Sequence, residues 1–335
     1  MKQQTRFWAT RTSGTVQCLL CPHSCSIGKG KTGVCGVRRN EDGVLWSLIY
    51  GSCSSVAADP IEKKPLFHFF PGSSVLSFGS VGCTFRCRHC QNFSISMSTP
   101  DEGRLREIMP DEAVSLAKEY GCRGLAWTYN EPTIWHEYAF DTMKRAKQAG
   151  LYTVYVTNGY IQEEPLRELS SYLDAMNIDV KAFTEKFYTS VCKAKLKPVL
   201  DACELAKKLG IHIELTYLVI PGLNDDLNEV KQFTDWVSQK LGVETPVHFS
   251  RFHPDYEMTD GKMTPLETLT ACYTIAKESG LCYVYVGNIL SNKYENTYCP
   301  QCNTLWVERR GFTARIMGIR DGKCQQCGTY APLKL

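Results

Sequence analysis

Three closely spaced cysteines are the residues of this chain best suited to carry chemistry. They form the pattern Cys83-x3-Cys87-x2-Cys90 and follow a strand-like apolar run, Val75–Phe78. Three thiolates in so short a segment can each bind one iron of a cubane and leave the fourth iron without a protein ligand. An open metal position is what a catalytic site needs and a structural site avoids. The alternative is a zinc site that takes its fourth ligand from a distant part of the chain.

A second cysteine group lies near the end of the sequence. Two Cys-x2-Cys knuckles flank a stretch, 305–319, whose alternating apolar residues indicate a hairpin. Two such knuckles supply four thiolates, and a region this small needs a metal to fold. We expect a zinc-ribbon-like tail with Zn²⁺ bound, and an auxiliary iron–sulfur cluster is the alternative. The four predicted ligands are Cys299, Cys302, Cys324 and Cys327.

A third group, Cys18-x2-Cys21-x3-Cys25-x9-Cys35, lies near the start of the chain. Four thiolates bind either zinc or a second [4Fe–4S] cluster, and His23 is a substitute for one of them. The spacing does not match a common zinc finger. We therefore predict a metal at this site and leave its identity open.

The high cysteine content indicates where the protein works. The chain has 17 cysteines in 335 residues but no apparent export signal, so reduced thiols that bind metals are favoured over disulfides. No run of about 18 apolar residues predicts a membrane span. We expect a cytoplasmic protein. The six cysteines outside the three groups are expected to be small buried apolar residues; they are Cys53, Cys122, Cys192, Cys203, Cys272 and Cys282.

Repeated strand–helix units must position the central cysteines. Units of roughly 30 residues predict parallel strands joined by right-handed crossovers. The predicted strands are 75–78, 125–128, 153–157, 175–180, 212–219, 247–251 and 283–286. Helices are expected near 111–120, 134–149, 165–172, 198–209, 227–241 and 265–279, most of them ending at a glycine.

These elements predict an α/β fold built on a full or partial TIM-type (β/α) barrel of parallel strands. Chemistry in such barrels lies at the carboxyl ends of the strands. We expect a Cys-rich N-terminal region (1–74), the barrel (75–290) and the zinc-ribbon-like tail (291–335).

The Cys83–Cys90 segment resembles the signature of radical S-adenosylmethionine (SAM) enzymes, and the resemblance extends over nearly the whole chain. It implies a [4Fe–4S] cluster on Cys83, Cys87 and Cys90 whose open iron binds SAM. Reductive cleavage of SAM then gives a 5′-deoxyadenosyl radical that abstracts hydrogen from a substrate. The resemblance also implies a reductant such as ferredoxin or flavodoxin.

The same resemblance assigns cofactor-binding roles after the second and third strands. Asn130 and Glu131 lie where related enzymes carry a Gly-Gly-Glu-type segment for the SAM amine. Only Glu131 matches that pattern directly, and a simple helix-entry turn is the alternative. Thr157 and Asn158 lie where the family places polar contacts to the ribose.

Later strand ends add further expected cofactor contacts. Asp179 and Lys181 resemble the Asp-Leu-Lys of glycyl-radical activating enzymes, with a surface ion pair as the alternative. Ile220 begins a segment similar to one that packs on adenine, and His89 lies where a backbone contact to adenine is usual. His253 follows the sixth strand and is expected to face the site unless its role is structural.

Several segments together resemble the radical SAM enzyme of the AmmeMemoRadiSam system, which is similar to pyruvate formate-lyase activating enzymes. These segments begin at Cys18, Asp59, Tyr129, Ser250 and Glu295. The resemblance implies Memo-like and AMMECR-like partner proteins. The substrate, a protein or a small molecule, is left open, and activation of a glycyl radical enzyme is the narrower alternative.

A basic tail suggests a function of another class. From residue 291 onward seven basic residues face three acidic ones, whereas the whole chain has a net charge of only +3. A metal-bearing nucleic-acid-binding protein built on the tail is therefore the alternative to an enzyme. We favour the enzyme, because the barrel with its open cluster makes up most of the chain.

Overall fold

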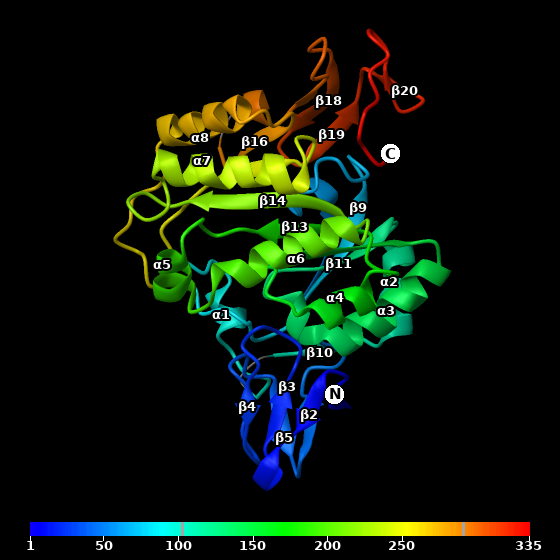
Figure 1. The fold of residues 1–335 in the computed structure, drawn as a ribbon. Helices are drawn as coiled ribbons and strands as arrows, with labels where there is room; N and C mark the ends of the chain where they lie inside the picture. Colours follow the sequence, from blue (N-terminus) through cyan, green and yellow to red (C-terminus); the bar gives the residue numbers. More distant parts are fainter. Residues whose placement is uncertain (102–103, 290–291) are drawn as a thin grey trace.

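The protein is described by a computed structural model that covers residues 1–101, 104–289 and 292–335. Its centre is an eight-stranded, largely parallel sheet in the order β16-β15-β14-β13-β12-β11-β9-β8 (Figure 1). The strands are β8 (Ser55–Pro60), β9 (Ser74–Gly79), β11 (Gly124–Trp127), β12 (Tyr152–Thr157), β13 (Ala175–Asp179), β14 (His212–Val219), β15 (Val247–Arg251) and β16 (Val284–Gly287). The predicted α/β fold is confirmed, and the sheet is an open, partial barrel.

All seven predicted strands form and pair in parallel in chain order, from β9 to β16. The eighth strand, β8, pairs antiparallel with β9 and was not predicted. It lies within residues 1–74, so the expected N-terminal region contributes one edge of the central sheet. The expected boundary at 290 and 291 lies outside the described residues.

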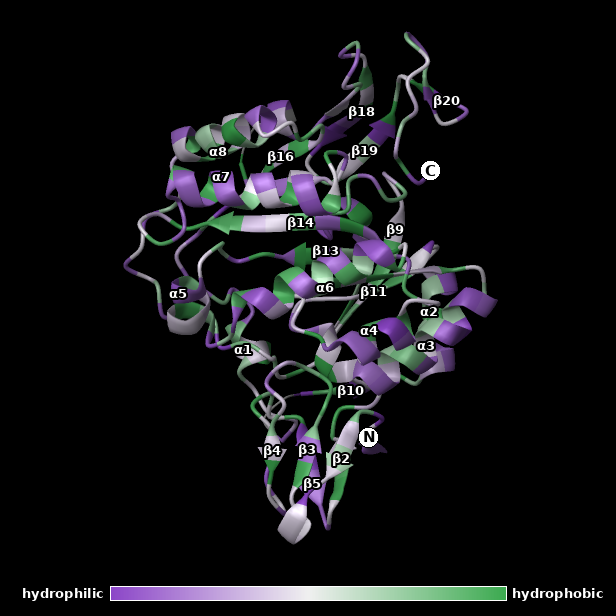
Figure 2. Cartoon of the chain, in the orientation of Figure 1, coloured by the Kyte–Doolittle hydropathy of each residue, from purple (hydrophilic) through white to green (hydrophobic). Residues whose placement is uncertain are grey.

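Helices between the strands carry alternating polar and apolar faces (Figure 2). Four of them end two residues before a glycine with φ between 65° and 86°, as the sequence predicts: Gly121, Gly150, Gly210 and Gly280. The helices are α1 (Phe93–Ser96), α2 (Pro110–Glu119), α3 (His136–Gln148), α4 (Glu163–Leu169), α5 (Glu185–Phe187), α6 (Leu196–Lys208), α7 (Leu227–Trp236) and α8 (Leu266–Glu278). Helix α7 is capped by the Asp226 side chain, which accepts hydrogen bonds from two backbone N–H groups of its first turn.

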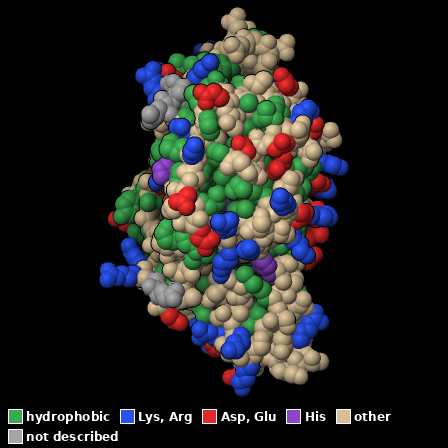
Figure 3. Space-filling model, turned by 90° about the vertical axis from the view of Figure 1, so that its left-hand side faces the viewer, with side chains coloured by type: hydrophobic (Ala, Val, Ile, Leu, Met, Phe, Trp, Pro, Cys, Tyr) green, Lys and Arg blue, Asp and Glu red, His purple; other side chains and the backbone are tan. Residues whose placement is uncertain are grey.

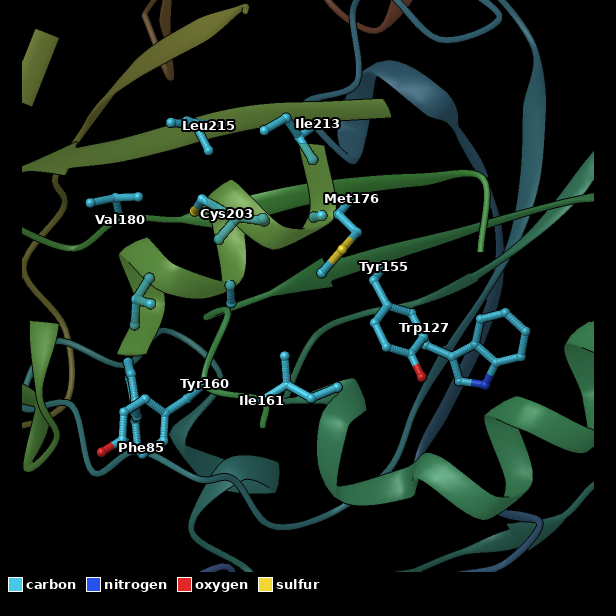
Figure 4. Packing of buried hydrophobic residues seen from close by; sticks show 14 of the residues in the cluster. Phe85, Trp127, Tyr155, Tyr160, Ile161, Met176, Val180, Cys203, Ile213 and Leu215 are labelled. Carbon is cyan, nitrogen blue, oxygen red and sulfur yellow. The ribbon is translucent and has the colours of Figure 1, made fainter. Parts of the chain in front are cut away.

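The two faces of the sheet bury two different clusters. Adjacent strand residues alternate between them, as the pleat requires. Tyr155 and Met176 belong to the larger core beneath the helices, part of which is drawn in Figure 4. Their neighbours Val154 and Ala175 instead pack with Ile61, in the segment that crosses the opposite face.

The crossing segment, residues 61–70, is fixed to the sheet by one carboxylate. The buried Glu214 of β14 accepts hydrogen bonds from the backbone N–H groups of Phe67 (2.9 Å) and His68 (2.7 Å). His212 and His248 also contact this carboxylate, at 3.0 and 2.7 Å. Burial opposes the charged form, but these partners outweigh it and lower the pKa of Glu214.

Two small β-rich regions lie at opposite ends of the molecule (Figure 1). The N-terminal strands are β1 (Gln3–Gln4), β2 (Trp8–Thr10), β3 (Val16–Cys18), β4 (Ser26–Ile27), β5 (Arg38–Glu41), β6 (Val44–Ser47) and β7 (Ser52–Cys53), the last paired with β10 (Arg106–Glu107). The C-terminal strands are β17 (Thr297–Tyr298), β18 (Leu305–Arg310), β19 (Thr313–Ile316), β20 (Ile319–Arg320) and β21 (Lys323–Cys324). The predicted hairpin in 305–319 is confirmed as β18–β19.

Five of the six scattered cysteines are buried, as predicted, and Cys282 is half-buried. No helix in the described ranges is long and apolar enough to cross a membrane.

Candidate active site

One cavity of about 490 Å³ collects the carboxyl ends of the parallel strands. It is lined by residues at or just beyond the ends of β11, β12, β13 and β16, together with the cysteine loop that follows β9. Nine predicted site residues line it: Cys83, Cys87, His89, Cys90, Asn130, Thr157, Asn158, Asp179 and Lys181. The residues predicted at the strand ends are therefore brought to one cavity.

The cysteine loop is held from outside by a single π-helical turn, Tyr188–Cys192. The backbone N–H groups of Arg86 and Arg88 donate to carbonyl oxygens of this turn at 2.9 and 3.1 Å. Phe85 anchors the loop in the core against the ring of Tyr160, with ring centroids 5.1 Å apart (Figure 4). The loop backbone is thus fixed, and its three cysteines line the cavity.

The Cys83 sulfur has two nitrogen donors beside it. The backbone N–H of Phe85 donates to Cys83 Sγ at 3.4 Å, and Asn158 Nδ2 lies 3.8 Å from it. Burial raises the pKa of the Cys83 thiol, and the nearby Glu131 and Cys87 add to this effect. Ligation therefore requires a metal that displaces the thiol proton, after which the two donors stabilise the thiolate.

Hydrogen bonds to the buried Glu131 carboxylate position Asn158 and Thr157. This carboxylate is 1% exposed and accepts hydrogen bonds from Thr157 Oγ1 (2.7 Å), the Asn158 N–H (2.9 Å) and the Thr133 N–H (2.9 Å). Burial raises the pKa of Glu131, although the three hydrogen bonds act in the opposite direction. Glu131 is not among the residues that line the cavity.

A positive charge lies beside the cysteine loop. Lys181 Nζ contacts Asp179 Oδ2 at 2.6 Å, and both side chains line the cavity. Burial disfavours the lysine charge, but Asp179 and the Cys87 thiol outweigh it, so the pKa of Lys181 is raised. His89 is buried, and burial together with the Lys181 charge lowers the pKa of its imidazole to about 3. The site therefore combines a fixed ammonium group with a neutral histidine.

Two predicted residues lie away from this arrangement. Ile220 is 2% exposed and does not line the cavity. His253 is exposed on the loop after β15, where Nδ1 lies 2.9 Å from the carbonyl oxygen of Pro254. The structure brings neither side chain to the three thiols.

One wall of the cavity lies outside the predicted strand ends. Residues 62–65 and Phe67 line it, and Lys64 of this wall belongs to a polar triad with Asp59 and Tyr129. Lys64 Nζ (2.7 Å) and Tyr129 Oη (2.6 Å) both donate to Asp59 Oδ2. Burial lowers the pKa of Lys64 to about 8, although Asp59 favours its charged form. In the sequence this wall belongs to the segment beginning at Asp59, one of those that carry the family resemblance.

Comparison with known proteins decides the family. The sequence profile of the Radical SAM superfamily matches residues 78–234. The chain is also 47% identical to the uncharacterized protein MJ0808 of Methanocaldococcus jannaschii, over 97% of this chain and 98% of that one. The chain belongs to the radical SAM superfamily.

More distant relatives of this radical SAM protein have names that state an activity. One is the pyruvate formate-lyase 1-activating enzyme of Escherichia coli K12, with 20% identity over 52% of this chain and 72% of the relative. Another is the 4-hydroxyphenylacetate decarboxylase activating enzyme of Clostridium scatologenes, with 22% identity over 56% and 70%.

The C-terminal cysteine group (Cys299, Cys302, Cys324 and Cys327) is arranged for a single metal ion. Its four sulfur atoms all lie within 4.8 Å of one another. The Cys299–Cys327 and Cys302–Cys324 sulfur pairs are each 3.6 Å apart. Burial opposes ionisation, but nearby N–H donors lower the pKa of Cys324 to about 5. The group is therefore suited to metal binding.

One of the basic residues of the tail lies inside the molecule and not on its surface. Arg309 is fully buried and donates to the carbonyl oxygens of Phe67 (2.6 Å) and Glu295 (2.9 Å). On the face shown in Figure 3, Lys and Arg side chains are interspersed with Asp and Glu. Part of the tail's positive excess therefore joins the tail to the rest of the molecule.

Proposed function

We propose that this radical SAM enzyme binds a [4Fe–4S] cluster on Cys83, Cys87 and Cys90 and cleaves SAM at the open iron. The observation that carries the proposal is the convergence of the three thiols with polar strand-end residues on one cavity. Its volume of about 490 Å³ lies within the usual range of sites for small molecules and cofactors. When bound, the cluster supplies the electron that splits SAM into methionine and a 5′-deoxyadenosyl radical.

The residues around the cavity fit these two cofactors. Asn158 orients toward Cys83 and stabilises its thiolate. Lys181, beside Cys87, offsets the negative charge of the thiolates. Thr157 and Asn158 offer polar groups for the ribose, and Glu131 positions both from below. Phe85 and other apolar groups along the cavity exclude water from a reactive radical.

Asp179 and Lys181 in our proposal contact the amino acid portion of SAM, and His89 contacts its adenine. In this arrangement Asn130 positions the backbone before the cysteine loop instead of contacting SAM. Its side chain accepts a hydrogen bond from the Ser80 N–H (3.1 Å) and donates one to the Gly82 carbonyl oxygen (2.9 Å). We also propose that the segment beginning at Ile220 packs on the adenine. We propose no contact to SAM for His253, whose side chain is exposed on the loop after β15.

We further propose that the radical abstracts hydrogen from a protein or small-molecule substrate. The names of the E. coli and Clostridium relatives make activation of a glycyl radical enzyme the narrower proposal. We also propose the AmmeMemoRadiSam subfamily, with its Memo-like and AMMECR-like partners, ferredoxin or flavodoxin as electron donor, and the reducing cytoplasm as location. Zinc is the metal that we propose for the C-terminal cysteine group.

The test is formation of 5′-deoxyadenosine by anaerobically reconstituted protein supplied with SAM and dithionite. Wild type is compared with the Cys83→Ala/Cys87→Ala/Cys90→Ala triple variant and with Cys282→Ser, a matched change in a cysteine outside the three groups. We expect product from wild type and Cys282→Ser and none from the triple variant. A wild-type protein that carries an intact cluster but forms no 5′-deoxyadenosine would falsify the proposal.

A further inference from the structure

The N-terminal cysteine group (Cys18, Cys21, Cys25 and Cys35) converges on one small cavity. All four cysteines line it, together with apolar residues and Arg38. Cys18 is buried and the other three are half-buried. Residues separated by up to 17 positions in the sequence are thus brought to one point, as the ligands of a metal site are.

The spacing of the sulfur atoms separates two kinds of metal site in this molecule. Thiolates around a single zinc, each about 2.3 Å from the metal, lie about 3.8 Å apart. The C-terminal cysteine group meets this condition, with sulfur pairs at 3.6 Å. Among the described residues, no other set of three or more Cys, His, Asp or Glu has all its ligand atoms within 4.8 Å.

The N-terminal cysteine group does not meet this condition, because no three of its four sulfur atoms all lie within 4.8 Å of one another. It shares this property with Cys83, Cys87 and Cys90, whose family binds a cubane. A cubane spreads its ligands because each thiolate binds a different iron. A cubane bound by four thiolates would have all four irons ligated and no open position.

A buried arginine supplies a second indication of an anionic group in this cavity. Arg38 is 1% exposed and lines the cavity. Its terminal nitrogens bond the Glu137 carboxylate and the Ile134 carbonyl oxygen, but its buried Nε has no hydrogen-bond partner among the described residues. This unpaired guanidinium N–H could donate to a cluster with four thiolate ligands, because such a cluster carries net negative charge.

The loops of the two cysteine groups are in direct contact. His23 Nε2 lies 2.7 Å from the carbonyl oxygen of Thr84, next to Cys83. The carbonyl oxygen of Cys35 lies 2.5 Å from the position that a Cβ on Gly82 would take. Arg86 links them again, because its guanidinium donates to carbonyl oxygens of both Cys83 and Val34. Only ligand loops separate the two sites.

We propose that the N-terminal cysteine group holds a second [4Fe–4S] cluster that delivers electrons to the cluster on Cys83, Cys87 and Cys90. A low-potential one-electron donor protein of the ferredoxin or flavodoxin class reduces the second cluster from the 2+ to the 1+ state. That electron then reduces the first cluster from 2+ to 1+, and the second returns to 2+. No bond or proton moves in this step. The inference rests on the proposed function only for the use of the electron.

The metal content of two variants tests the identity of the site. The Cys83→Ala/Cys87→Ala/Cys90→Ala variant leaves the N-terminal cysteine group intact and, after anaerobic reconstitution, should keep about four irons per chain. Its reduced form should give a [4Fe–4S]⁺ electron paramagnetic resonance (EPR) signal that SAM does not change. The Cys18→Ser/Cys21→Ser variant should keep the other cluster, whose signal does respond to SAM. Zinc without iron in the first variant would overturn the inference.

The electron route is tested by comparing two reductants. SAM cleavage by Cys18→Ser/Cys21→Ser is measured with dithionite and with a reduced ferredoxin or flavodoxin, beside wild type and Cys282→Ser. We expect the ratio of protein-driven to dithionite-driven rates to fall roughly tenfold in the double variant only. An unchanged ratio in a variant that lacks the second cluster overturns the relay. Failure of wild type with both reductants, despite an iron-loaded N-terminal cysteine group, instead refutes the proposed function.

Discussion

At the scale of single residues, the 62–67 wall of the strand-end cavity contains a charged residue, Lys64, paired with the buried Asp59. Asp59 and Lys64 are 5% and 1% exposed. Burial works against the carboxylate, but hydrogen bonds from Lys64, Tyr129 and Lys63 hold the pKa of Asp59 below its usual value. A pair of this kind stabilises little by itself, yet loss of one partner leaves a buried charge uncompensated.

Lys64→Met should lower the free energy of unfolding by about 3 kcal/mol, because it leaves Asp59 buried without its closest cation. Lys63 contacts the same carboxylate at 2.9 Å, but its side chain is 45% exposed. The matched change Lys63→Met should therefore cost less than about 1 kcal/mol. Denaturant unfolding of both variants checks this. Equal losses would show that the Asp59–Lys64 pair does not support the wall.

At the scale of elements, the junction between β9 and the cysteine loop depends on a glycine. Gly82 has φ of 86°, and a Cβ there would approach the Cys35 carbonyl oxygen and the Val37 side chain at 2.5 and 2.8 Å. Gly121 has a similar φ of 65°, but a Cβ there would meet no atom within 4 Å. A side chain at Gly121 would therefore meet backbone strain alone, whereas one at Gly82 would meet both backbone strain and steric overlap.

Gly121→Ala should cost about 1 kcal/mol of folding stability through its positive φ alone. Gly82→Ala should cost roughly 2 kcal/mol more, because it also pushes the N-terminal loop away from the cysteine loop. Thermal unfolding of both variants measures the difference. Equal costs would mean that the two loops do not pack as closely as described.

Segment 61–70 also makes stability depend on pH. His68 is fully buried, with Nε2 2.7 Å from Tyr285 Oη, and burial lowers its pKa to about 3. An unfolded histidine has a pKa of about 6.5, so between these pH values the unfolded state binds one more proton and stability falls as the pH falls.

His68→Gln should reduce this acid sensitivity by up to about 1.4 kcal/mol per pH unit. Unfolding free energies of wild type and the variant between pH 6 and pH 4 provide the measurement, in which the other titrating groups cancel. Parallel curves for the two proteins would contradict a neutral buried His68.

The strand–helix order could be predicted from the sequence because each unit carries its own periodicity and glycine stop. Strand β8 could not, because Ser55–Pro60 contains alanine, aspartate and proline and forms a strand only beside the edge of β9. The wall at 62–67 could not be predicted for a similar reason. It is set by Glu214, which bonds Phe67 from 147 positions away. Cysteine spacing likewise predicts ligands but not how close two ligand groups lie.

At the scale of the whole molecule, the C-terminal region completes the enzyme instead of forming a separate module. Trp306 and Ile319 pack with Phe67 and with Tyr285 of β16 in one buried cluster. Gly311 and Phe312, in the turn between β18 and β19, line the same cavity as the cysteine loop. The fold of this region therefore affects the site.

Cys302→Ser should abolish zinc binding at the C-terminal cysteine group, because three thiolates hold the ion much more weakly than four. Residues 297–331 should then become sensitive to proteolysis while the central sheet stays protected. Metal analysis and limited proteolysis of this variant, beside Cys282→Ser, test the point. Iron in place of zinc in wild type, or unchanged protection in the variant, would contradict it.

The most direct test of the central claim is the EPR spectrum of the reduced protein with and without SAM. An open iron on the Cys83–Cys90 loop predicts that SAM changes the g-values of one [4Fe–4S]⁺ signal in wild type. That signal should be absent from the Cys83→Ala/Cys87→Ala/Cys90→Ala variant. A wild-type signal from these cysteines that saturating SAM leaves unchanged would mean that the cavity is not a SAM site.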